Sequence, residues 1–95
     1  MTCHDLKILP QFFQAVVDGR KTFELRREDD RMFHIGDTLT LCEWRPGSGH
    51  TGRQCKVAVV YILRHADFAD GIPEGYAVLS IRVVGKGLYP GEVPE

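Results

Sequence analysis

The chain has 95 residues, a net charge of −1 and a pI of about 6.4; 43% of its residues are hydrophobic and 26% are charged. This length gives one domain with one modest core, and the share of apolar residues excludes a disordered chain. The near-neutral charge argues against a protein that coats nucleic acid non-specifically, because such binding depends on many Lys and Arg contacts with phosphate.

The first two predicted elements are a strand and a helix. Residues 5–9 form a short strand, and Pro10 then begins a helix, because a proline at the first helical position loses no hydrogen bond. Gly19 ends the helix, as a glycine just past the last turn commonly does. The apolar face of the helix comprises Phe12, Phe13, Ala15, Val16 and Val17.

Strand patterns occupy most of the remaining chain. The predicted strands cover residues 22–27, 38–44, 56–64 and 76–84, and the loops between them contain glycine, proline and charged residues. In the strand over 56–64, alternation places Val57, Val59, Tyr61 and Leu63 on one face and Ala58, Val60 and Ile62 on the other, so both faces are predicted to be covered. In the last strand Ala77, Leu79, Ile81 and Val83 point inward.

These elements predict a mainly β (α+β) fold. Five to six strands form a small closed or nearly closed barrel, and the early helix packs against it. Residues 1–84 form the barrel domain, and residues 85–95 form a loose C-terminal tail that contains glycine and proline.

The segment Gly19–Arg26 carries the strongest chemical signal, with the pattern G-x-K-x-x-E-x-R. The glycine places Lys21 at the helix–strand junction, and strand alternation directs Glu24 and Arg26 to the same side. Arg26 offers a planar fork of donors and Lys21 a point charge, so the pair can hold a phosphate, while Glu24 can accept hydrogen bonds from a base or sugar. Taken from the residues alone, a solvent-facing strand with alternating charge is the more frequent outcome.

The motif resembles the signature of the ASCH domain, a member of the PUA-like β-barrels. The similarity covers about residues 4 to 83 and points to an uncharacterised branch that is usually called a domain of unknown function with an RNA-binding-like fold. The further matching segments are His4-x-Leu6-Lys7, Pro10-x-x-Phe13, Asp30-Arg31-x-Phe33, Gly36-Asp37-x-Leu39-x-Leu41-x-Glu43-Trp44 and Thr51-Gly52-Arg53.

The resemblance implies a cleft between helix and barrel that takes RNA or a nucleotide. Some ASCH proteins are instead amidohydrolases that deacylate a modified cytidine, and some have been proposed as ribonucleases. The amidohydrolase branch has a nucleophilic threonine where this chain has Glu24, and it has a second threonine at the Thr22 position. Its catalytic glutamate comes from a longer segment before the last strand, to which Glu74 does not align. This chain therefore lacks the nucleophile of that reaction.

Several other residues are candidates for the rest of the cleft. Trp44 can stack a base, although a tryptophan more often packs into a core. Arg45 and Arg53 flank the glycine-rich hairpin loop 46–52 and are more often solvated than bound to phosphate. The full set of additional candidates is His4, Lys7, Arg31, Trp44, Arg45, His50 and Arg53.

Metal and cofactor chemistry is not expected. No C-x-x-C or H-x-x-x-H spacing occurs, and Cys42 and Cys55 lie in strand patterns, where cysteine behaves as a small hydrophobe. We expect a cytoplasmic monomer without a membrane span, because the apolar runs are short, no signal peptide is visible, and three cysteines do not make a disulfide framework.

The favoured interpretation is an RNA- or nucleotide-binding domain whose pocket comprises Lys21, Glu24 and Arg26, extended by Lys7, Arg31, Trp44 and Arg53. The first alternative is a small hydrolase acting on a modified nucleoside or on RNA, with Lys21 as the base and Glu24 as its partner. A further alternative is a protein-interaction module whose cleft takes an acidic peptide.

Overall fold

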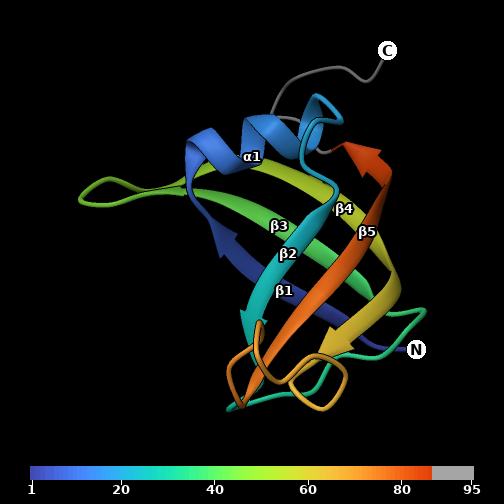
Figure 1. Ribbon diagram of the computed structural model, residues 1–95. Helices are drawn as coiled ribbons and strands as arrows, with labels where there is room; N and C mark the ends of the chain where they lie inside the picture. The colour runs from blue at the N-terminus through green and yellow to red at the C-terminus, as the bar shows by residue number, and fades with distance from the viewer. Residues whose placement is uncertain (87–95) are drawn as a thin grey trace.

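A computed structural model describes residues 1–86 as one curled five-stranded sheet with a single helix across one end (Figure 1). The prediction of a mainly β fold with one early helix is confirmed. The elements are β1 (Cys3–Ile8), α1 (Pro10–Val17), β2 (Phe23–Arg27), β3 (Thr38–Arg45), β4 (Gly49–Arg64) and β5 (Tyr76–Lys86). Most of the tail predicted over residues 85–95 lies outside the described residues, and Gly85 and Lys86 belong to β5.

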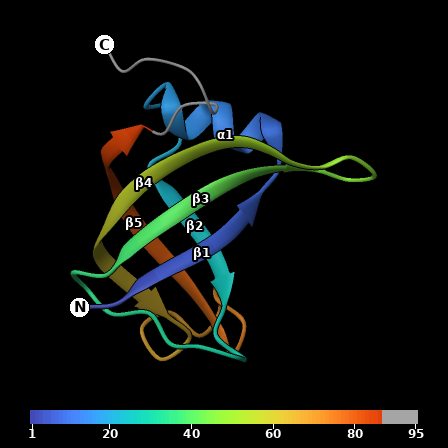
Figure 2. The same cartoon turned by 180° about the vertical axis from the view of Figure 1, so that it is seen from behind.

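The strands follow the order β1-β3-β4-β5-β2, which leaves β1 and β2 at the two edges. β1 pairs in parallel with β3, and the other three pairings are antiparallel. Figures 1 and 2 show β2 and β5 on one side of the curl and β1 and β3 on the other. The sheet is thus a half-barrel, and the two edge strands do not pair with each other.

We call the gap between β1 and β2 the seam. A side chain rather than a backbone ladder bridges it, because Arg26 Nη2 donates a hydrogen bond of 3.0 Å to the Lys7 carbonyl oxygen. Full closure into a barrel, which would have removed both edges, does not occur among residues 1–86. The seam is therefore where the interior of the sheet is accessible.

Helix α1 begins and ends as its sequence predicts. Pro10 lies in the first turn, and after the C-cap Asp18 the chain turns at Gly19, whose φ is +78°. The amides of Gly19 and Arg20 donate to the carbonyls of Val16 and Ala15, which is the Schellman arrangement that a glycine favours. With only eight residues, the helix that the structure describes is too short to reach across a bilayer.

The core lies on the concave face of the sheet, beneath α1. Phe13 and Val16 of the helix are buried there against the inward-facing residues of the strands. Leu39 and Leu41 share the inner face, and alternate residues of β5 point inward as predicted. The cluster comprises Leu6, Ile8, Phe13, Val16, Phe33, Leu39, Leu41, Cys55, Val57, Val59, Ile62, Ala77, Leu79 and Ile81.

The prediction for the second half of β4 is wrong. Simple alternation placed Tyr61 beside Val59, yet Val59 and Ile62 are buried while Val60 and Tyr61 are exposed. The pairing with β5 shifts its register between Val59 and Tyr61, and this bulge inserts one residue and reverses the phase of the strand. The outer face there is consequently not covered.

The hairpin between β3 and β4 is longer than predicted. β4 begins at Gly49, so part of the predicted loop 46–52 is strand, with Trp44 opposite His50 and Arg45 opposite Gly49. The two strands continue past the barrel as a projecting arm (Figures 1 and 2).

Candidate functional site

Strand β2 carries Glu24 and Arg26 inward and its apolar residues outward. Glu24 is only 3% exposed, whereas Phe23 and Leu25 on either side of it are 50% and 54% exposed. Strand alternation had placed them on opposite faces, but alternation alone does not say which face is buried. A buried carboxylate between two exposed apolar side chains is the reverse of an ordinary surface strand.

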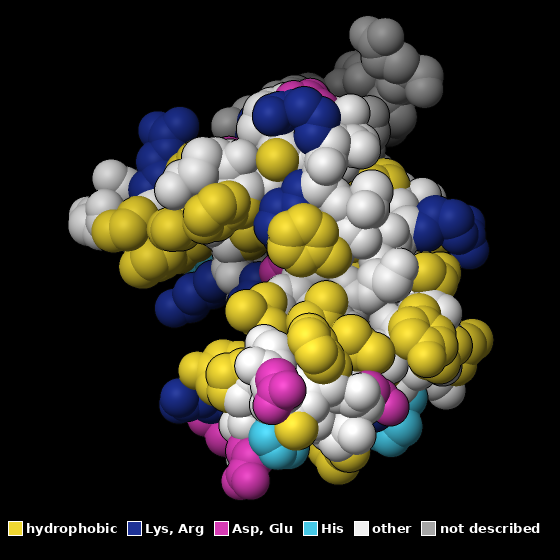
Figure 3. Space-filling view, in the orientation of Figure 1, with side chains coloured by type: hydrophobic (Ala, Val, Ile, Leu, Met, Phe, Trp, Pro, Cys, Tyr) yellow, Lys and Arg dark blue, Asp and Glu magenta, His cyan; other side chains and the backbone are white. Residues whose placement is uncertain are grey.

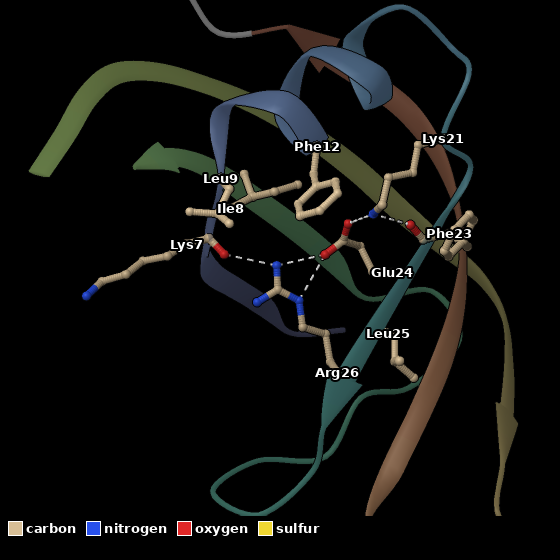
Figure 4. A pocket seen from close by; sticks show the side chains of 9 residues that line it. All are labelled: Lys7, Ile8, Leu9, Phe12, Lys21, Phe23, Glu24, Leu25 and Arg26. Atoms are coloured by element: carbon tan, nitrogen blue, oxygen red, sulfur yellow. Dashed lines mark hydrogen bonds and ion pairs between the residues drawn. The ribbon is translucent and has the colours of Figure 1, made fainter. Parts of the chain in front are cut away.

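Two cations hold the Glu24 carboxylate. Lys21 Nζ is ion-paired with Oε2, while Arg26 donates to Oε1 from Nε at 2.9 Å and from Nη2 at 2.7 Å (Figure 4). The side chains of Lys21 and Arg26 are 17% and 24% exposed, so the cluster is largely removed from water. The cation–anion–cation arrangement that the G-x-K-x-x-E-x-R spacing predicts is therefore present.

Local backbone structure explains this convergence. The turn at Gly19 returns the chain over the end of α1, and the Lys21 amide donates a hydrogen bond of 3.0 Å to the Ala15 carbonyl. From Phe23 the chain pairs with β5, with Glu24 opposite Leu79 and Arg26 opposite Ala77. Leu79 and Ala77 point into the core, so Glu24 and Arg26 lie on the inward face of β2.

The cluster retains unused hydrogen-bond donors. Lys21 Nζ also donates to the Phe23 carbonyl at 2.7 Å, which uses two of its three N–H groups. Arg26 uses Nε and Nη2, and no other group among residues 1–86 contacts its Nη1 within hydrogen-bond distance. Because both Glu24 oxygens already accept from the cations, the cluster offers donors to a ligand.

These donors lie beside a cavity of about 470 Å³ in the seam. Figure 4 shows the cavity between the start of α1, the end of β1 and strand β2. Figure 3 shows a hollow on this face of the molecule, bordered by apolar side chains. The lining residues are Lys7, Ile8, Leu9, Phe12, Lys21, Phe23, Glu24, Leu25 and Arg26.

Of the residues that the sequence predicted for the site, four line the cavity and three do not. Lys7, Lys21, Glu24 and Arg26 come together there. Arg31 lies in the loop after β2, 3.8 Å from Asp30. Trp44 and Arg53 do not line the cavity.

Trp44 is half-buried and lies outside the core cluster, contrary to the expectation that it packs into the core. The Lys7 ammonium lies 4.9 Å from the centroid of its ring. Arg53 is not simply solvated either, because its guanidinium lies over the Phe13 ring and 3.9 Å from the buried Glu43. Arg45 and His50 are exposed on the projecting arm.

His4, another candidate, has a structural position. Its Nε2 lies 2.9 Å from Asp37 Oδ2, and both side chains are buried. Burial raises the pKa of Asp37, but the hydrogen bonds from His4 and from the amides of Thr2 and His34 outweigh it and lower the pKa below its usual value. This pair joins the start of β1 to the loop before β3.

The sequence did not reveal the apolar wall of the cavity. Leu9, Phe12, Phe23 and Leu25 read as ordinary core residues of a helix and a strand. The one available signal was that Phe23 and Leu25 alternate with the motif residues, so that burying Glu24 forces both of them outward.

The structure offers little for metal or thiol chemistry. Within residues 1–86, no three His, Cys, Asp or Glu side chains are grouped so that they could hold a metal ion. Burial, with a smaller effect from Asp5, raises the pKa of the Cys42 thiol, which disfavours the reactive thiolate.

Comparison with known proteins identifies the family. Residues 3–81 match the family described as "Domain of unknown function (DUF3850)". An "Uncharacterized 12.9 kDa protein in GpA 3'region" of Escherichia phage P2 is 34% identical over 85 residues, which cover 90% of this chain and 72% of the phage protein. The crystal structure of hypothetical protein PH0355 has a similar fold, with a TM-score of 0.58, 14% identity, and coverage of 86% of this chain and 99% of that one. The chain belongs to the DUF3850 family.

Proposed function

We propose that the seam cavity binds a nucleotide, either free or as part of an RNA strand. The observation that carries the proposal is the set of unused donors on Arg26 and Lys21, which lie beside a cavity with aromatic walls. Paired cationic donors suit phosphate oxygens or the carbonyl oxygens of a base. The neighbouring aromatic rings suit the flat face of a base.

The apolar walls and the volume support the same ligand. Phe12 and Phe23 line the cavity and are 46% and 50% exposed, and exposed apolar side chains gathered at one place often mark a ligand-binding site. A cavity of about 470 Å³ falls in the range of small-molecule sites. It suits one nucleotide with its base unstacked, and it excludes a duplex.

The similarity to the ASCH domain and the PUA-like barrels supports a nucleotide ligand. The residues of the G-x-K-x-x-E-x-R motif line a cavity between helix and sheet, where the resemblance implies a cleft. We therefore propose that this DUF3850 domain is an ASCH-type domain of the PUA-like group and that it shares their use of the cleft.

A hydrolase acting on a modified nucleoside is the alternative, and the direct contact of Lys21 with Glu24 favours it. Two features weigh against it. Both oxygens of Glu24 are engaged by Lys21 and Arg26, and Thr22 is not among the residues that line the cavity. Binding without catalysis is the better-supported function.

Titration with a mononucleotide and with short RNA oligomers tests the proposal. Arg26→Ala removes the positive charge and the free Nη1 donor, and it should weaken binding by about 1.5–3 kcal/mol. Arg82→Ala is the matched control, because Arg82 is exposed on β5 and does not line the cavity. Arg64, another arginine at a strand end, is unsuitable as a control because it forms an ion pair with the buried side chain of Glu28, so that its loss would also affect stability.

Two further measurements separate a pocket from diffuse charge. Neutralising about two phosphates predicts a slope of roughly 1.4 in a plot of log affinity against log salt. Arg26→Lys keeps the charge but removes the planar guanidinium, which holds Glu24 and the Lys7 carbonyl through Nε and Nη2 and leaves Nη1 free, so it should lose most of the affinity that Arg26→Ala loses. Equal losses from Arg26→Ala and Arg82→Ala would contradict the proposal, provided that both variants keep the wild-type circular dichroism spectrum.

A further inference from the structure

Lys7 directs its backbone and its side chain to different parts of the surface. Its carbonyl oxygen accepts the hydrogen bond from Arg26 in the seam. Figure 4 shows the side chain pointing away from the cavity, and its ammonium lies 4.9 Å from the centroid of the Trp44 ring. One residue of the edge strand β1 therefore joins the cavity to the neighbouring surface of β3.

That surface carries aromatic and basic side chains together. Trp44 pairs across β3 and β4 with His50, and directly paired residues lie on the same face of a sheet. His50 is exposed. We call Lys7, Trp44 and His50 the Trp44 platform. Asp5, two residues before Lys7 on β1, bounds it on the side away from the arm.

Trp44 is only partly covered by the rest of the protein. Tryptophan is highly buried on average but rarely fully buried, and this side chain is half-buried and lies outside the core cluster. The Lys7 ammonium lies over the Trp44 ring and is carried on a flexible stem. A ligand base can displace such an ammonium from the ring face, and the ammonium can then pair with a phosphate.

We propose that the Trp44 platform is a second subsite, which stacks an unpaired base of single-stranded RNA while the neighbouring nucleotide occupies the seam cavity. This inference rests on the function proposed for the cavity. Adjacent strands lie about 5 Å apart, so a chain that leaves the cavity across β1 reaches β3 within a short span. Lys7 then lies beneath the phosphate that links the two nucleotides, and Trp44 and His50 face the second base.

The cavity and the Trp44 platform together select a narrower class of ligand than the cavity alone. A free nucleotide fills the cavity alone, whereas a strand of two or more nucleotides engages both places. Splayed, unstacked bases occur in single-stranded RNA and in loops and are unavailable in a regular duplex. The expected partner is therefore a short single-stranded RNA segment.

Trp44 itself provides the assay, because it is the single tryptophan of the chain. The probes are 5′-phosphorylated mono-, di- and tetranucleotides of adenosine and uridine, with affinities measured by calorimetry and stacking followed by tryptophan fluorescence. A mononucleotide should bind without quenching Trp44. Di- and tetranucleotides should quench it and bind about 5- to 150-fold more tightly, which is the range expected for one stacked base.

Variants test whether the gain in affinity with probe length comes from the Trp44 platform. Trp44→Leu should abolish the gain with length and leave the mononucleotide dissociation constant unchanged, while Trp44→Phe should keep part of the gain. Tyr61→Leu is the matched control, because Tyr61 is an aromatic residue exposed on β4 and does not line the cavity. Lys7→Ala keeps the carbonyl that Arg26 contacts, so it should weaken the longer probes more than the mononucleotide.

The outcomes separate the two proposals. If affinity does not rise with the length of the probe, or if the rise persists in Trp44→Leu, the proposal that the Trp44 platform stacks a base is wrong. Binding of the mononucleotide would still support the proposal for the cavity. If only the longer probes bind, with an affinity that Trp44→Leu abolishes and Arg26→Ala leaves unchanged, the cavity proposal fails and only the stacking role of Trp44 is retained. An absence of binding by every probe overturns both.

Discussion

Glu24→Gln should destabilise the fold substantially, because it removes the negative charge that lies between the largely buried cations of Lys21 and Arg26. Glutamine keeps the size of the side chain and one carbonyl acceptor, so the change is one of charge rather than of packing. Lys21 and Arg26 would then remain close together beside the core without a counter-ion. The seam would lose the group that orients the Arg26 guanidinium toward the Lys7 carbonyl.

The structure sets the magnitude. Removing one partner of a fully buried ion pair costs about 3–5 kcal/mol. The Glu24 side chain is 4% exposed, but the two cations retain some contact with water, so we expect about 2–3 kcal/mol. A domain of this length has a total stability of roughly 5–14 kcal/mol, and the melting temperature should fall by about 8–24 °C.

Urea unfolding followed by circular dichroism measures the effect. Glu74→Gln is the control, because the Glu74 side chain is 88% exposed and its substitution should change the free energy of unfolding by less than about 0.5 kcal/mol. In the double variant Lys21→Met/Glu24→Gln the two losses should not add, since the two residues are in contact. A loss for Glu24→Gln no larger than that for Glu74→Gln would refute the view that this carboxylate holds the cations.

Three other predictions follow from the fold and the site. The Arg64 hydrogen bonds lower the pKa of Glu28 from its usual value of 4.5, so their contribution is complete above that pH and is lost as the pH falls through the folded-state pKa. The difference in unfolding free energy between wild type and Glu28→Gln should accordingly shrink in urea titrations below about pH 5. Because the bulge in β4 buries Ile62 and exposes Tyr61, Ile62→Ala should lower the free energy of unfolding by about 2–5 kcal/mol and Tyr61→Ser by under about 0.5 kcal/mol. A larger loss for Tyr61→Ser than for Ile62→Ala would contradict the bulge at this position. Incubation with acylated cytidine, followed by chromatography, should show no efficient deacylation, because Glu24 has no hydroxyl to serve as a nucleophile; turnover by wild type that Lys21→Ala abolishes would make the hydrolase interpretation correct.

Local sequence signals determined the elements and part of the site. Pro10 and Gly19 set the limits of the helix, because one lacks an amide that the first turn does not need and the other tolerates a positive φ. The spacing of Lys21, Glu24 and Arg26 brought the three charges together, because a turn followed by an extended strand places alternate residues on one side. These are relations within a few residues of chain, which the sequence contains directly.

Only the tertiary structure decided what those charges face. Whether Glu24 or its apolar neighbours Phe23 and Leu25 lie inward depends on β2 being an edge strand opposite β1, and that follows from pairings between distant segments. The open seam, the separation of Arg53 from the cavity and the reversed phase at Tyr61 arise in the same way. Strand alternation has a period of two and no absolute phase, so one bulge or one unpaired edge changes which side chains are buried without any change in the local pattern.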